Sequence, residues 1–201
     1  MLNIETLTLG AYGTNCYIVH DGASKTCCVI DPGYTPEKVL DKVRSLGLTV
    51  EAILLTHGHF DHVGGVREIA AETGCRVYLC ADDLSMPPQM TAGPLYYTET
   101  YGEGDTLHLA GLTISVIRTP GHTPGSVCLL IENAMFCGDT LFAGSCGRTD
   151  LPGGSWAAMQ TSLGRLAGLQ ADYRVYPGHG EPTTLAREKR YNPYLTQPRS
   201  L

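Results

Sequence analysis

Six consecutive residues of the sequence contain three histidines and one aspartate: His57, His59, Asp61 and His62. His57 and His59 are two residues apart, so in an α-helix their side chains would point about 200° away from each other. In an extended segment they would share one face, and both imidazoles could reach the same ion. Asp61 and His62 follow where a helix is expected to begin, so they point elsewhere and could bind a second ion. A group of surface histidines is the alternative, but an apolar run before the segment and a Gly-Gly pair after it favour a built site.

Three later segments each place a histidine or an aspartate directly after an apolar, strand-like run. They are TPGHTPGS (119–126), CGDTLF (137–142) and YPGHGEP (176–182), which contain His122, Asp139 and His179. Taken singly, the two histidines suit ordinary turns, and the aspartate suits a turn or a helix N-cap. Residues that follow strand ends can nevertheless converge on one rim of a sheet sandwich.

Together these residues would complete a site for two metal ions. Such a hydrolytic site needs about three protein ligands for each ion, a bridging carboxylate and open positions for water. The predicted ligands of the first ion are His57, His59 and His122. The predicted ligands of the second ion are Asp61, His62 and His179, with Asp139 as the bridge.

The chemistry expected of this site is hydrolysis. Two divalent ions lower the pKa of a bridging water to near 7, from about 15.7 in bulk, so a metal-bound hydroxide could attack a carbonyl group. Asp61 and Asp139 are the predicted catalytic carboxylates. No Ser-His-Asp or Cys-His arrangement stands out in the sequence, and Cys146 is not needed as a nucleophile.

Three further polar residues have weaker claims on the site. Asp31, in the sequence IDPG at a strand end, could orient a metal-bound imidazole, or it could simply form an Asp-Pro-Gly turn. His20 lies beside an Asp-Gly turn and His108 lies inside a strand-like run, so both are expected to be structural or exposed.

The elements that position these residues follow from hydrophobic periodicity and turn residues. Strands are expected at 4–9, 15–20, 26–30, 51–55, 76–80, 105–109, 112–118, 126–132, 134–137 and 173–176. Helices are expected at 36–46, 62–72, 155–167 and 182–190. A long segment between them, 81–104, has no clear period, and its Tyr96, Tyr97 and Tyr101 could shape a pocket or simply pack. Helices are interleaved singly among many strands, which predicts an α+β fold of two mixed sheets packed face to face with helices outside.

Composition bounds the class of protein. A chain of 201 residues predicts one domain, 1–201, with a C-terminal arm at about 182–201 packed on it. The sequence shows no apolar run of about 18 residues and no secretory signal, so neither a membrane span nor export is expected, and we expect a cytoplasmic protein. The eight cysteines form no CxxC pair and are expected to be reduced and buried. A formal charge of −6 argues against a nucleic-acid partner.

The pattern HxHxDH, followed by a separate His, Asp and His, resembles the metallo-β-lactamase superfamily. Within it, the stretches LFAGSCGRTDLPGG and EKRYNPYL resemble the short bacterial glyoxalase II-like (hydroxyacylglutathione hydrolase-like) branch. The resemblance implies an αββα four-layer sandwich and two divalent ions, zinc foremost, with iron or manganese as the other options. It also implies a small-molecule thioester of the hydroxyacyl-glutathione type as the substrate.

The sequence departs from that branch in two places. Full-length glyoxalase II enzymes carry a C-terminal helical domain with cationic glutathione ligands, which this sequence does not contain. They also follow the bridging aspartate with a Cys-Gly-basic segment and then a tyrosine that contacts glutathione. Cys146 and Arg148 match that segment and are the predicted substrate contacts, but Asp150 stands where the tyrosine is expected. Arg148 could bind a substrate carboxylate, or it could bond loop carbonyl groups.

Proteins of other classes share this pattern. Persulfide dioxygenases have the same fold and the same His and Asp residues, but they use one iron and O₂, and GSCGRTD resembles that branch as well. A lactonase or another hydrolase of the fold is a further alternative. A non-catalytic metal-binding protein is disfavoured because the set of potential ligands is complete.

Overall fold

Apolar runs in the first half of the chain form a six-stranded mixed sheet in the computed structural model, which describes residues 1–196. The strand order is β1-β2-β3-β4-β5-β6, antiparallel from β1 to β3 and parallel from β3 to β6. The strands are β1 (Leu2–Leu9), β2 (Thr14–Asp21), β3 (Thr26–Ile30), β4 (Thr49–Leu54), β5 (Arg76–Cys80) and β6 (Glu99–Tyr101).

A second six-stranded mixed sheet comes from the rest of the described chain, in the order β14-β13-β10-β9-β8-β7. Only β10 and β13 are parallel neighbours in it. The strands are β7 (Thr106–Leu109), β8 (Leu112–Arg118), β9 (Val127–Ile131), β10 (Ala134–Gly138), β13 (Arg174–Pro177) and β14 (Thr183–Thr184). A small separate hairpin consists of β11 (Leu141–Phe142) and β12 (Ser145–Cys146).

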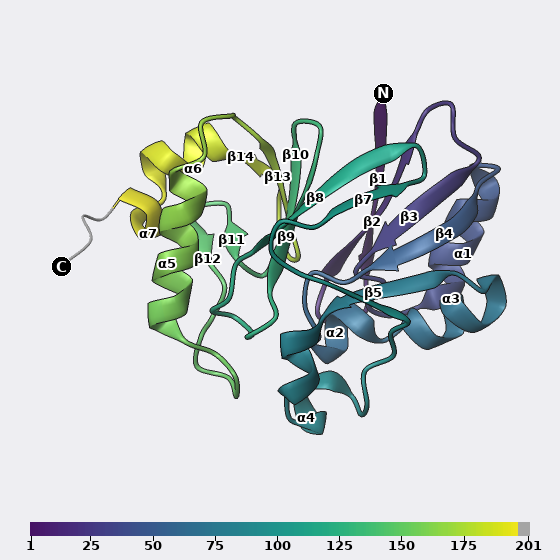
Figure 1. Ribbon diagram of the computed structural model, residues 1–201, viewed down its shortest axis with the longest axis horizontal. Coiled ribbons are helices and arrows are strands. Elements are labelled where there is room, and N and C mark those ends of the chain that lie inside the picture. Colours follow the sequence, from purple (N-terminus) through teal and green to yellow (C-terminus); the bar gives the residue numbers. More distant parts are fainter. Residues whose placement is uncertain (197–201) are drawn as a thin grey trace.

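Helices cover the outer faces of the two sheets (Figure 1). On the first sheet lie α1 (Pro36–Ser45) and α3 (Val66–Thr73), and on the second lie α5 (Trp156–Ala167), α6 (Leu185–Tyr191) and α7 (Pro193–Thr196). One core fills the space between the sheets, and two further cores lie between each sheet and its helices. The predicted αββα four-layer sandwich is confirmed.

Strand β2 contributes side chains to two hydrophobic cores. Successive side chains of a strand point to opposite faces, and here Cys16 and Ile18 pack toward the helices while Tyr17 and Val19 pack between the sheets. Both faces are buried along the middle of the strand, which is why residues 16–19 form an uninterrupted apolar run. The eight cysteines are free and, except for the half-buried Cys146, buried, as expected of reduced thiols.

The helix predicted at 62–72 is two helices, α2 (Phe60–Val63) and α3. The reason is a close approach of the loop that follows β3: Gly65 N donates to Pro32 O at 2.8 Å. A Cβ at Gly64 would lie 2.1 Å from Gly33 O, so no larger residue fits there. Because of this break, α2 runs in a different direction from α3, and this direction sets the orientation of the Asp61 and His62 side chains.

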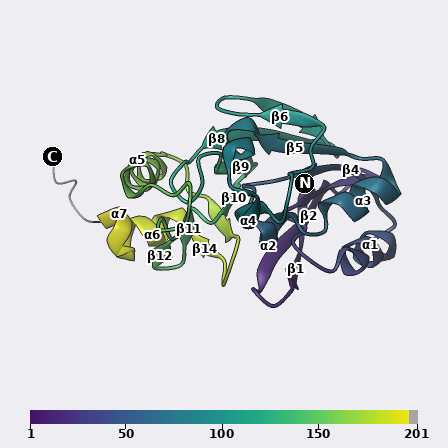
Figure 2. The same cartoon turned by 90° about the horizontal axis from the view of Figure 1, so that it is seen from below.

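The segment 81–104 has more structure than its sequence predicts. It contains a 3₁₀ turn, η1 (Ala81–Ser85), then α4 (Pro88–Thr91) and the edge strand β6. Figure 2, the view from below, shows α4 beside α2 near the middle of the molecule, and in Figure 1 both lie below the first sheet. Tyr101 is buried in the core between the sheets, whereas Tyr96 and Tyr97 are exposed, so packing was the correct alternative for Tyr101.

The C-terminal helix predicted at 182–190 is α6, preceded by the short strand β14. The predicted arm 182–201 includes residues 197–201, which lie outside the described residues. Among residues 1–196, no helix has both the length and the apolar character needed to cross a membrane. A cytoplasmic location stays a prediction.

Candidate metal centre

Loops at one rim of the sandwich carry the histidines and carboxylates that the sequence singled out. His57 and His59 follow β4, and Asp61 and His62 lie in α2. His122 lies in the loop between β8 and β9, while Asp139 follows β10 and His179 follows β13. The rim therefore collects side chains from segments more than a hundred residues apart.

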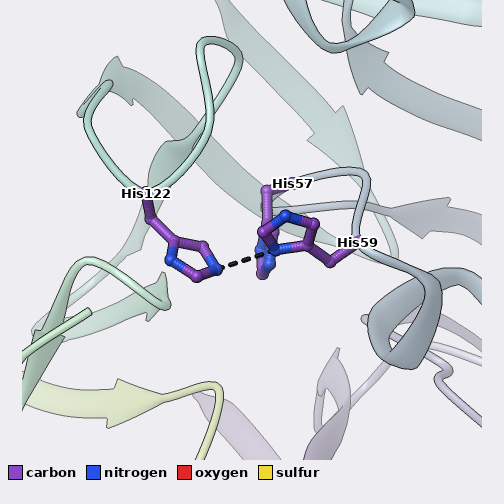
Figure 3. Close-up of side chains that lie close together, drawn as sticks. All are labelled: His57, His59 and His122. Carbon is purple, nitrogen blue, oxygen red and sulfur yellow. Dashed lines mark hydrogen bonds between the residues drawn. The ribbon is translucent and has the colours of Figure 1, made fainter. Parts of the chain in front are cut away.

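His57, His59 and His122 form one compact group, with potential ligand atoms all within 4.8 Å of one another. Figure 3 shows the three imidazoles converging from two loops, with His59 Nδ1 2.8 Å from His122 Nε2. His59 is extended (φ −67°, ψ 145°), so the spacing of His57 and His59 acts as predicted. These residues are the ones predicted for the first ion.

Asp61, His62 and His179 form the second group, again with potential ligand atoms within 4.8 Å of one another. His62 Nε2 lies 3.3 Å from His179 Nε2, and Asp61 Oδ2 lies 3.2 Å from the same His179 atom. These residues are the ones predicted for the second ion.

Asp139 lies between the two groups. Its Oδ1 is 3.5 Å from His62 Nε2, and its Oδ2 is 3.4 Å from His122 Nε2 and 3.5 Å from His179 Nε2. A carboxylate in this position can contact cations held by either group, which is what a bridging ligand requires.

The donor atoms fit divalent ions. Among the residues described, the buried atoms His57 Nε2, His59 Nε2 and Asp139 Oδ1 have no hydrogen-bond partner, although buried polar atoms are almost always paired. Imidazole nitrogens and carboxylate oxygens at open positions suit zinc, iron or manganese. Ions held by the two groups would satisfy these atoms.

Neighbouring charges set the protonation of the imidazoles. Burial and the surrounding histidines hold the pKa of His57 well below its usual value and lower the pKa of His59 to about 4, so both keep a free lone pair. Burial acts in the same direction on His62, but Asp139, Asp31 and Asp61 outweigh it and raise its pKa to about 9. The second group is therefore strongly attractive to positive charge.

Asp31 is placed to orient an imidazole. Its Oδ2 lies 3.0 Å from His62 Nδ1 and accepts from Thr56 Oγ1 at 2.6 Å, while its Oδ1 accepts from Thr56 N at 2.8 Å. Both oxygens of this buried carboxylate are thus used, and Asp31 leaves His62 Nε2 to face the second group. Of the two interpretations left open by the sequence, the geometry supports the orienting one.

Backbone carbonyl groups orient two more of the histidines. His122 Nδ1 lies 2.7 Å from Arg148 O, and His179 Nδ1 lies 3.1 Å from Tyr12 O. A proton on each Nδ1 leaves Nε2 free to bind a cation. Thr14 Oγ1 donates to Asp61 Oδ2 at 3.1 Å and steadies that carboxylate.

Asp83 is a buried carboxylate that the sequence did not single out. It accepts from Gly58 N at 2.7 Å and from Gly125 N at 2.6 Å, and Thr123 Oγ1 donates to it at 3.0 Å. Gly58 stands between His57 and His59, and the other two donors follow His122 in the chain. Asp83 therefore joins the two loops that carry the first group.

We expect Asp83→Asn to weaken metal binding at the first group by about 10- to 100-fold, the usual effect of losing a residue that orients ligands. In the variant, the amide nitrogen of asparagine would face backbone N–H groups that, in the wild type, donate to a carboxylate oxygen. Chelator competition measures the affinity. Asp82→Asn, at the exposed neighbouring carboxylate, is the matched control. A purely structural role would lower the melting temperature and leave the affinity unchanged.

A cavity of about 550 Å³ opens beside both groups, which is the size of a small-molecule site. Asp61, Asp139 and three of the histidines form part of its lining. Its apolar wall consists of Tyr12, Phe60, Met90, Phe142 and Leu151. Within the segment 81–104, Met90 reaches this cavity, and Tyr96 lines a different one.

The hairpin β11–β12 forms one side of the cavity, and α6 holds it in place. Asn192 Nδ2 donates to Ser145 O at 2.9 Å, and buried Glu188 accepts from Gly144 N at 2.7 Å. Asn192 Nδ2 also donates to Glu188 Oε2 at 2.9 Å. These two residues were not foreseen from the sequence.

Cys146 and Arg148 both line the cavity. Burial raises the pKa of the Cys146 thiol to about 11, so it stays protonated at neutral pH, which disfavours a nucleophilic role. Among the residues that the structure describes, the Arg148 side chain bonds no loop carbonyl group and pairs instead with Asp150. In the described part of the chain, the side chains of His20 and His108 hydrogen-bond only to local groups, Asp21 O and Thr113 Oγ1, as expected of residues outside the site.

Two mixed sheets between helices, with histidines and carboxylates gathered on one rim, define the class of αββα metallohydrolases. The chain belongs to the metallo-beta-lactamase superfamily, whose family model matches residues 9–179.

Relatives with assigned names are similar over much of the chain. Hydroxyacylglutathione hydrolase GloC of Haemophilus influenzae is 32% identical over 209 residues, which cover 96% of this chain and 98% of the relative. A hydroxyacylglutathione hydrolase of Rhodospirillum rubrum is 41% identical over 165 residues, which cover 81% of this chain but only 60% of that longer protein.

Solved structures share the fold closely. BLEG-1 B3 metallo-beta-lactamase superposes with a TM-score of 0.87 at 33% identity, over 98% of this chain and all of the other. TTHA1623, crystallised in a di-iron-bound form, has a TM-score of 0.83 at 39% identity, over 95% and 100%. ETHE1 from Myxococcus xanthus has a TM-score of 0.82 at 28% identity, over 98% and 86%.

Proposed function

We propose that this protein is a hydrolase of small thioesters, of the hydroxyacylglutathione hydrolase type, that uses two divalent metal ions. The observation that carries the proposal is the complete set of donors, two groups of three with Asp139 between them. The similarity to the Haemophilus influenzae hydrolase over nearly the whole of both chains supports the substrate class.

The chain's own residues would bind and orient the reactants. His57, His59 and His122 would hold one ion, and Asp61, His62 and His179 the other, with Asp139 shared. Asp61 and Asp139, which line the cavity, would act as the two catalytic carboxylates. Asp31 and the carbonyl groups of Arg148 and Tyr12 would keep the imidazoles in register during turnover.

When bound, the ions would supply Lewis acidity that lowers the pKa of water to about 7 and polarises the substrate carbonyl group. Zinc is the first choice, and the di-iron form of TTHA1623 supports iron as well. Phe60 and Phe142 would hold the acyl group against the rim and exclude bulk water. A thiolate is a good leaving group, so cleavage of a thioester requires no strong general acid. It also requires no cysteine nucleophile, which agrees with the protonated state of Cys146.

A mononuclear-iron persulfide dioxygenase is the second candidate, and the similarity to the ETHE1 structure supports it. It would need only one of the two groups. Persulfide dioxygenases share these His and Asp residues, so the number of bound ions distinguishes the two candidates: the second group would hold an ion in the hydrolase and none in the dioxygenase. A lactonase or β-lactamase would use the same two groups, and the similarity to BLEG-1 supports that option.

The test is metal content and turnover measured on one preparation, purified without added metal. We expect about two ions per chain and hydrolysis of S-lactoylglutathione that a chelator abolishes and added zinc restores. Lactone and β-lactam substrates serve as comparisons. One iron per chain, no hydrolysis, and O₂ uptake with glutathione persulfide would make the protein a dioxygenase instead.

A further inference from the structure

Arg148 is the one arginine or lysine among the residues that line the cavity, counted over residues 1–196. Its guanidinium is already bound. Arg148 Nε donates to Asp150 Oδ1 at 2.7 Å, and Nη2 donates to Asp150 Oδ2 at 2.8 Å. This two-pronged geometry is the one in which arginine binds carboxylates best. Asp150 does not itself line the cavity, but it takes up two of the guanidinium donors that a substrate carboxylate would need.

The backbone keeps this ion pair at the cavity. Arg148 O accepts the Nδ1 proton of His122, which ties the loop to the first metal group. One residue earlier, a Cβ at Gly147 would lie 1.8 Å from the backbone carbonyl oxygen of Asp139, so the loop packs closely against the main chain of the bridging residue. Asp150 follows Arg148 by two residues and therefore stays within reach of its guanidinium. Arg148 lowers the pKa of Asp150 to about 2, so the carboxylate is ionised at neutral pH.

Within the described chain, the neighbouring wall of the cavity is apolar and provides no further positive charge to bind an anion. Tyr12 and Phe60 pack edge to face, with ring centroids 5.1 Å apart, and Met90, Phe142 and Leu151 complete an apolar surface. A carboxylate that entered here would have to displace Asp150 from Arg148 and would then lie close to the displaced charge. An apolar or uncharged group meets neither obstacle.

We propose that Asp150 determines specificity for the thiol half of the substrate: by occupying the guanidinium of Arg148, it makes the cavity select thioesters whose thiol half presents no carboxylate there. The inference rests on the proposed thioesterase function and names the substrate class more closely. Both side chains are largely exposed, 61% for Arg148 and 68% for Asp150, so the preference is one of degree: glutathione thioesters remain substrates, but weaker ones.

The experiment compares S-lactoylglutathione with its diethyl ester, which keeps the thioester and the peptide but has both carboxylates masked as uncharged esters. For the metal-loaded wild type, we expect a higher KM for the acid than for the diester. Asp150→Asn should lower the ratio of the two KM values by about tenfold, the combined effect of freeing one exposed ion pair and removing one repulsive charge. The change should appear in KM rather than in kcat, and it should shrink at high salt because it is electrostatic.

Asp41→Asn is the matched control, since Asp41 forms an exposed pair with Arg44 at 2.9 Å, far from the rim, and should leave the ratio unchanged. Arg148→Gln combined with Asp150→Asn should remove the response to the substrate carboxylates. An unchanged ratio in Asp150→Asn would overturn the inference. If neither thioester is hydrolysed, the proposed function fails, and calorimetric binding of S-methylglutathione and its diethyl ester to the same variants still decides whether Asp150 selects against carboxylates.

Discussion

Asp139→Asn should lower kcat/KM for S-lactoylglutathione by about 10³-fold, because the loss of a bridging carboxylate forfeits several kcal/mol of transition-state stabilisation at tenfold per 1.36 kcal/mol. Within residues 1–196, Asp139 is the one residue whose carboxylate oxygens lie within 3.5 Å of nitrogens from both groups. The amide of asparagine keeps the shape of the side chain but removes the charge. The amide nitrogen, which replaces one of the carboxylate oxygens, would also direct its N–H groups toward His62 or His122.

The metal content of the same variant separates this effect from misfolding. We expect Asp139→Asn to retain one ion or fewer per chain and to unfold at a temperature close to that of the metal-free wild type. Asp41→Asn, on the exposed face of α1, should keep full metal content and activity. Full metal content together with full activity in Asp139→Asn would show that the two groups need no bridge.

Gly178→Ala should disrupt the site with a single methyl group. An added Cβ would lie 2.2 Å from Asp139 Oδ1 and 2.6 Å from His62 Cε1, well inside van der Waals contact. The backbone cannot give way easily, because Gly178 N donates to Gly138 O at 2.8 Å and Gly178 O accepts from Asn15 N at 2.7 Å. Asp139 and His62 would therefore be the groups that move, and a shift of about 1 Å at a catalytic group can cost roughly 100-fold in rate.

Thermal unfolding and metal analysis test this prediction. Overpacking of about 1–3 kcal/mol corresponds to a fall of about 2–12 °C in melting temperature for a chain of this size. Gly102→Ala is the control, since a Cβ there meets nothing within 4 Å. Wild-type metal affinity and turnover in Gly178→Ala would mean that the rim adapts without displacing its donors.

The fold and the grouping of donors were predictable because they depend on local patterns. The two-residue spacing of His57 and His59 needs only an extended backbone to bring their side chains together, and each later donor follows an apolar run that ends at the same rim. The break between α2 and α3 also had a visible signal, the Gly64-Gly65 pair, which the helical period of the flanking residues obscured.

Other features depend on contacts that no local pattern encodes. Asp83 serves Gly58 and Gly125, which are 25 and 42 residues away, and in the sequence it looks no different from the exposed Asp82. The strands β11 and β12 are two residues long, too short for a period to be read. The pairing of Arg148 with Asp150, by contrast, has a short-range signal in their separation by two residues.

Different residues hold the metal donors and the hairpin side of the cavity. Asp31 and Asp83 hold the donor loops from within the first half of the chain, whereas Glu188 and Asn192 hold the hairpin β11–β12 from α6. Substitutions in the hairpin, or in the helix behind it, can therefore change the cavity wall while Asp31 and Asp83 still hold their donor loops; the link to the donors on this side is Arg148 O, which orients His122. Such an arrangement favours the evolution of new specificities: substitutions on the hairpin side can change which substrates the cavity binds while the metal ligands stay the same.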